Sequence, residues 1–171
     1  MAHRNHRGSR KPGGTGPGKQ VMKRQASDNA YLHKDFHGAL NQALIYLEQN
    51  FGAGAVREYL HQFARAFYAP LTGEIKERGL EALKTYLESL YSLEGAKFSI
   101  KFSPDELILS VAACPAVGHI RKMGLPVSRH FDETTRTVNS AICEGTGYEF
   151  ELLEYDLESG RRVERYSRSR P

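Results

Sequence analysis

The stretch AKFSIKFSPDELILSV, residues 96–111, decides the fold, because the spacing of apolar residues changes there from a helical to a two-residue period. A turn-forming Ser-Pro-Asp divides the stretch into two halves that each alternate apolar and polar side chains. This pattern predicts a β-hairpin with one buried face. The apolar positions are Phe98, Ile100 and Phe102 before the turn, and Leu107, Leu109 and Val111 after it.

Helices are predicted on both sides of this hairpin. Before it, apolar residues recur at helical spacing over 29–50, 55–69 and 71–93, and the last stretch is interrupted near Gly79. After it come two shorter helices, over 115–124 and 128–144, and a second hairpin with strands over 148–156 and 161–166. The order ααα-ββ-αα-ββ predicts a single α+β domain, in which helices cover a mostly antiparallel sheet of two hairpins.

The chain of 171 residues has a formal net charge of +4 and a pI of about 9.1, and its excess of basic residues lies at the ends. Residues 1–24 hold seven Lys or Arg, no acid and few large apolar side chains, so they predict a disordered basic tail. We expect the folded domain over 25–166 and a short basic end over 167–171. The residues after the tail carry a net charge of −3, so nucleic acid is expected only in weak contacts of the tail.

Several classes of function lack their sequence signatures. No apolar run is long enough for a signal peptide or a transmembrane helix, so no membrane partner is expected. The chain has two cysteines, which together with the missing signal predicts a cytoplasmic protein. No cofactor is predicted, since no dinucleotide fingerprint is present and the one faint glycine loop lies in the tail. His33 and His37, four residues apart on the first helix, could share a metal ion, but nothing in the spacing demands one and no metal is predicted.

The segment CPAVGH, residues 114–119, holds the first candidate site. Cys114 stands where a strand ends and a helix begins, and the positive end of that helix would stabilise a thiolate. Cys114 is therefore a candidate nucleophile, with His119 and His37 as candidate proton carriers. The alternative is that Cys114 is a small apolar residue that fits a tight junction.

The predicted helix 128–144 carries the second candidate site. Its polar row of Asp132, Arg136, Asn139 and Cys143 shares one face, beside an apolar row of Phe131, Thr135, Val138 and Ile142. We interpret the apolar row as the core face and the polar row as a pocket wall. There Arg136 would bind a substrate carboxylate, Asn139 would orient the substrate, and Cys143 would be a second thiol. The alternative is a surface pair of Asp132 with Arg136 and an incidentally buried Cys143.

Five segments, taken in order, resemble the bacterial L-2-amino-thiazoline-4-carboxylic acid hydrolase-like family. They are YLHKDFHGALNQALIYLEQNFG, VREYLHQFARAFYAPL, CPAVGHIRKMG, TTRTVNSAICEG and ELLEYDLESG, and the likeness covers about residues 29–166. The resemblance implies a small α+β cytoplasmic protein that opens a thiazoline ring by hydrolysis to a carbamoyl-cysteine. No catalytic residue is carried over from the family, so the candidate residues rest on the pattern of this chain.

Two functions remain open on these grounds. The first is a small-molecule hydrolase acting on a C=N or amide-like bond. The second is a non-catalytic module that binds or senses a small molecule, an idea comparable to the four-vinyl-reductase-type ligand-binding domains. Both readings take a small molecule as the partner of a pocket in the folded domain.

Overall fold

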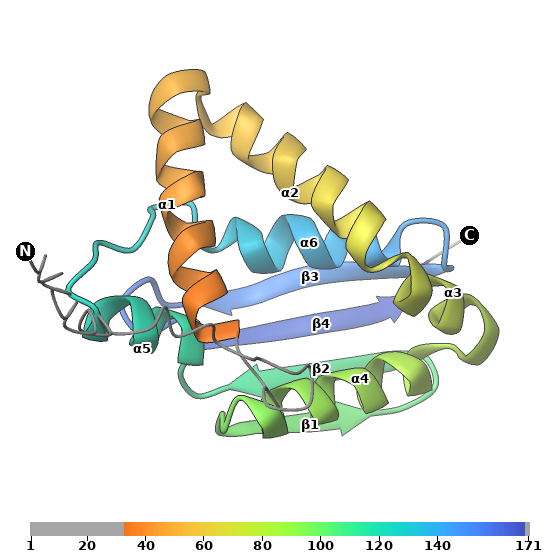
Figure 1. The fold of residues 1–171 in the computed structure, drawn as a ribbon. Coiled ribbons are helices and arrows are strands. Elements are labelled where there is room, and N and C mark those ends of the chain that lie inside the picture. Colours follow the sequence, from red (N-terminus) through yellow and green to blue (C-terminus); the bar gives the residue numbers. More distant parts are fainter. Residues whose placement is uncertain (1–32, 170–171) are drawn as a thin grey trace, which may run out of the picture. The chain divides into compact units, whose positions relative to one another are not determined.

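The computed structural model describes residues 33–169. In this part of the chain, six helices and four strands follow one another (Figure 1). The helices are α1 (His33–Phe51), α2 (Ala53–Phe67), α3 (Ala69–Arg78), α4 (Leu80–Leu93), α5 (Pro115–Lys122) and α6 (Glu133–Cys143). The strands are β1 (Phe98–Phe102), β2 (Glu106–Val111), β3 (Tyr148–Tyr155) and β4 (Arg162–Arg168). The predicted α+β fold with an antiparallel sheet is confirmed.

The four strands form one antiparallel sheet in the order β1-β2-β4-β3, so the two predicted hairpins join through their second strands. Helix α4 packs on β1 and β2, and α6 packs on β3 (Figure 1). The inner strands bury one face against the helices. Across β2 and β4 that face consists of Leu107 paired with Tyr166, Leu109 with Glu164, and Val111 with Arg162, all of them buried.

The predicted third helix, 71–93, is two helices. Gly79 lies between them with φ 67°, in the left-handed region that favours glycine, and its N–H donates to the Ile75 carbonyl at 2.8 Å. The interruption expected near this glycine therefore ends α3 and allows α4 to start in a new direction. Pro70 occupies the first turn of α3, where its missing N–H costs no helical hydrogen bond.

Helix α6 starts five residues later than predicted, because residues 128–132 form a turn that is held by α1. The buried Asn41 side chain donates to the Pro126 carbonyl and accepts from the Ser128 N–H, both at 2.8 Å. These two bonds fix the connection between α5 and α6 onto α1. No described helix is both long enough and apolar enough to cross a membrane.

Strand β4 continues to Arg168, so the expected end of the domain at residue 166 is too early. The Arg168 Nε donates to Asp105 Oδ1 at 2.6 Å, which ties this part of the predicted basic end to the turn between β1 and β2. The predicted tail over 1–24 lies outside the described residues.

Candidate functional site

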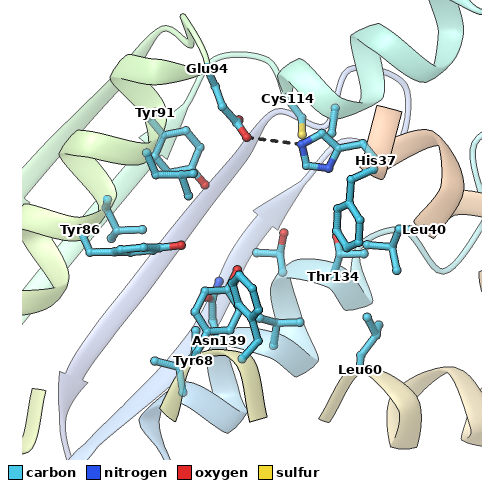
Figure 2. Close-up of a pocket in the computed structure, with 18 of the residues that line it drawn as sticks. His37, Leu40, Leu60, Tyr68, Tyr86, Tyr91, Glu94, Cys114, Thr134 and Asn139 are labelled. Carbon is cyan, nitrogen blue, oxygen red and sulfur yellow. Dashed lines mark hydrogen bonds and ion pairs between the residues drawn. The ribbon is translucent and has the colours of Figure 1, made fainter. Parts of the chain in front are cut away.

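A cavity of about 720 Å³ lies among α1, α2, α4, α6 and the hairpin of β3 and β4 (Figure 2). Aliphatic and aromatic side chains make up most of its wall, and a few polar groups interrupt them. Phe36, Phe67 and Leu93 line the cavity and are also 42%, 58% and 58% exposed, so its rim is apolar. The volume and the lining are those of a small-molecule site.

Aromatic rings gather at one end of the cavity, which we name the aromatic end: Phe63, Phe67, Tyr68 and Tyr86. Phe63 stacks on Phe67 with ring centroids 5.3 Å apart, and Tyr68 meets Tyr86 edge to face at 6.1 Å. Burial raises the pKa of both tyrosines, so their hydroxyl groups stay protonated. This end offers ring faces and edges rather than charge.

Polar groups gather at the other end, which we name the polar end: His37, Tyr91, Glu94, Cys114, Tyr155 and Arg162. Figure 2 shows the Cys114 thiol, the His37 ring and the Glu94 carboxylate directed into this part of the cavity. His37 Nε2 lies 3.4 Å from Glu94 Oε1, and the Glu94 side chain is only 8% exposed. The carboxylate therefore fixes the orientation of an imidazole that faces the same space as a thiol.

Cys114 is held at the polar end by the turn between β3 and β4. It is the residue before the first turn of α5, as predicted, and its N–H donates to the Ser159 carbonyl at 2.9 Å. Gly160, with φ 66°, packs so closely that a Cβ there would collide with Cys114 and lie 3.0 Å from Val117 Cγ2. Only glycine fits this position, so the local backbone sets where the thiol lies.

A buried ion pair supports the polar end from the sheet. Arg162 Nε donates to Glu164 Oε1 at 2.6 Å, and its two Nη atoms donate to the Gly160 carbonyl at 3.2 Å and to the Tyr91 hydroxyl. The arginine side chain is 7% exposed and that of the glutamate 1%. A pair removed from water in this way is stable only when further hydrogen bonds satisfy both groups.

The second carboxylate oxygen of Glu164 accepts two further hydrogen bonds of this kind. Oε2 accepts from the Tyr166 hydroxyl at 2.7 Å and from Asn139 Nδ2 at 3.2 Å. Asn139 lines the cavity as predicted, but within the described residues its amide supports a carboxylate of the protein. The network thus connects α4, α6 and β4.

Three of the six predicted site residues line the cavity, namely Cys114, His37 and Asn139, and three do not. Arg136 is half exposed and lies 3.7 Å from Asp132, so the prediction that it faces the pocket is wrong. Cys143 is buried away from the cavity, and burial raises the pKa of its thiol to about 12. His119 lies outside the cavity lining, and its Nε2 is buried without a hydrogen-bond partner among the described residues.

The apolar row of the 128–144 stretch is buried, as predicted, whereas most of the polar row does not form the predicted pocket wall. The row interpreted as the core face, Phe131, Thr135, Val138 and Ile142, lines the cavity. Of the row interpreted as a pocket wall, only Asn139 does. A cavity bounded by apolar side chains continues the core, so an apolar helix face contributes to both.

The sequence patterns did not predict five further residues of the cavity and its support, namely Tyr91, Glu94, Tyr155, Arg162 and Glu164. A signal existed for two of them, because Arg162 and Glu164 share the two-residue period of Tyr166, the large apolar residue of the last strand. Charged residues in phase with a buried tyrosine indicate a buried polar network. Among the described side chains, no three of His, Cys, Asp or Glu gather as a metal-binding group.

No family model matches the chain, and the search of curated proteins finds no match to it. The resemblance to the L-2-amino-thiazoline-4-carboxylic acid hydrolase-like family therefore stays a prediction.

Proposed function

We propose that this protein binds a small molecule with an apolar body in the cavity of the α+β domain. The observation that carries the proposal is a cavity of about 720 Å³ that has ring-lined walls at one end and a few hydrogen-bonding groups at the other. Protein interiors are otherwise packed as densely as organic crystals, and unfilled space forfeits dispersion contacts. A bound ligand that fills the cavity would supply the missing dispersion contacts.

Nile red, whose fluorescence rises in apolar surroundings, tests this proposal directly. We expect saturable binding to the full chain at one site, and loss of that binding in Leu90→Trp, where the larger ring occupies the cavity. Leu153→Trp is the matched control, because Leu153 is 43% exposed on β3 and outside the lining. Equal binding by both variants, or no binding by the parent protein, would contradict the proposal.

Hydrolysis of an amide-like bond is a second candidate, favoured by the placement of Cys114, His37 and Glu94 around one space. The Cys114 sulfur would add to the electrophilic carbon while its proton passes through His37 to the leaving nitrogen. Water would then hydrolyse the thioester and restore the thiol.

The two unpaired cysteines also support a reducing compartment, and we propose the cytoplasm.

Cys114→Ala separates the two candidates. If the protein is a hydrolase, this variant loses turnover of amide-like or thiazoline substrates and keeps binding Nile red. Cys143→Ala is the matched control, since its thiol is buried outside the cavity. Turnover retained by Cys114→Ala would exclude the cysteine mechanism.

A further inference from the structure

The polar end of the cavity holds more hydrogen-bond donors than the protein itself uses. Tyr155 and Arg162 are paired across β3 and β4, so their side chains start side by side on the same face of the sheet. The Tyr91 hydroxyl accepts from Arg162 Nη2, which brings α4 to the same point. All three residues line the cavity.

Arg162 has donors to spare. A guanidinium has five N–H groups, and within residues 33–169 those of Arg162 meet three acceptors: Glu164, the Gly160 carbonyl and the Tyr91 hydroxyl. Two N–H groups, one on each Nη, are left without an acceptor in this part of the chain. Because the charge of Arg162 is balanced by Glu164, the guanidinium is held in place before any ligand arrives.

The two tyrosines add hydroxyl donors. Among the described residues, the Tyr91 hydroxyl has no acceptor for its own proton, and the Tyr155 hydroxyl, which lines the cavity, makes no hydrogen bond. Burial raises the pKa of both phenols far above neutrality, and a charged Cys114 would raise the pKa of Tyr155 further. Both groups therefore present O–H at physiological pH.

The carboxylates near these donors already have partners of their own. Glu164 is occupied by Arg162, Tyr166 and Asn139. Glu94, the carboxylate that lines the cavity, has His37 as a partner. Donors that line the cavity and have no acceptor among the described residues are available to a bound molecule.

We propose that the ligand is an amphipathic monocarboxylate, whose carboxylate is bound by Arg162, Tyr91 and Tyr155 and whose hydrocarbon body lies along the aromatic end. This inference rests on the proposed binding function and names the chemical class of the ligand. A carboxylate has two oxygens with about four acceptor sites, which match the two N–H and two O–H donors. The rings of Phe63, Tyr68 and Tyr86 then contact the body of the ligand.

Displacement of Nile red by decanoate, decanol and methyl decanoate tests the ligand class. We expect decanoate to bind about tenfold tighter than decanol or the ester, because hydrogen bonds to a charged acceptor are the stronger ones. Tyr155→Phe should weaken decanoate about tenfold and leave decanol unchanged. Tyr59→Phe is the matched control, as Tyr59 is 41% exposed on α2 and outside the lining.

The outcomes separate this inference from the function on which it rests. Displacement by none of the three probes overturns the proposed binding of apolar small molecules together with this inference. Displacement by all three with equal affinity overturns the carboxylate assignment alone. If Tyr155→Phe does not fold, the affinities of decanoate and decanol for the parent protein still test the carboxylate assignment. Tyr91→Phe is a second variant of the same donor set.

Discussion

At the polar end of the cavity, hydrogen bonds of fixed direction join Arg162 and Glu164 to each other and to their neighbours, while at the aromatic end rings meet through broad faces and edges. A directional network depends on each of its members, since removing one partner leaves a buried charge or donor unsatisfied. Packed rings share their contacts, so the loss of one is partly taken up by the others. A single substitution at the polar end should therefore change the free energy of unfolding more than one at the aromatic end.

The largest effect is expected for Glu164→Ala. It leaves Arg162 as an uncompensated buried charge and removes the acceptor of Tyr166 and Asn139, which should lower the free energy of unfolding by about 3–5 kcal/mol. Urea denaturation measures this. Glu154→Ala is the control, because its pair with Arg161 is half exposed and should contribute about 0–1 kcal/mol. Similar losses in the two variants would show that the buried network contributes no more to stability than an exposed ion pair.

A smaller loss is expected from Leu60→Ala, on the apolar wall. Leu60 is fully buried but faces the cavity, so it has fewer neighbours to lose, and we expect a cost of about 2 kcal/mol, the low end for such truncations. Leu83→Ala, equally buried and away from the cavity, should cost more, about 3–4 kcal/mol. The reverse order in urea denaturation would mean that the cavity is filled by side chains in solution.

The two cysteines should differ in how fast their thiols are alkylated. Cys143 is buried and keeps its proton, since its pKa is raised to about 12, whereas Cys114 lines the cavity. With iodoacetamide near pH 8, the Cys143→Ser variant should react about tenfold faster or more than Cys114→Ser. Mass spectrometry of the native protein over time measures this, and equal rates would place both thiols in similar surroundings.

The smallest effect is expected from Arg136→Ala, which removes a partly exposed pair with Asp132, the residue before α6. The free energy of unfolding should change by about 0.5 kcal/mol or less, and Nile red binding should stay the same. Asn139→Ala, three residues further on the same helix, removes a bond to buried Glu164 and should cost about 1 kcal/mol or more. A change of ligand affinity in Arg136→Ala would restore the predicted role of that residue in binding.

Local sequence patterns predicted much of the fold and selected three residues that line the cavity, Cys114, His37 and Asn139. The two-residue period around Phe98 and Leu107 identified the first hairpin, because alternation along a strand is a property of the strand itself. The phase of α6 was harder, since its two candidate rows lie only about 100° apart and either could face the interior. Arg136 and Cys143 were misplaced for that reason.

The sequence by itself determined the class of the fold, the sheet of two hairpins and the position of Cys114 at the start of α5, since spacing and turn residues act over short distances along the chain. Only the tertiary structure decided that a cavity exists and which side chains line it. Tyr91, Asn139 and Arg162 belong to separate elements, and Arg162 is buried because Glu164 and Tyr91 meet it there. Burial of a charge depends on partners that are distant in sequence, so no local pattern of residues could show it.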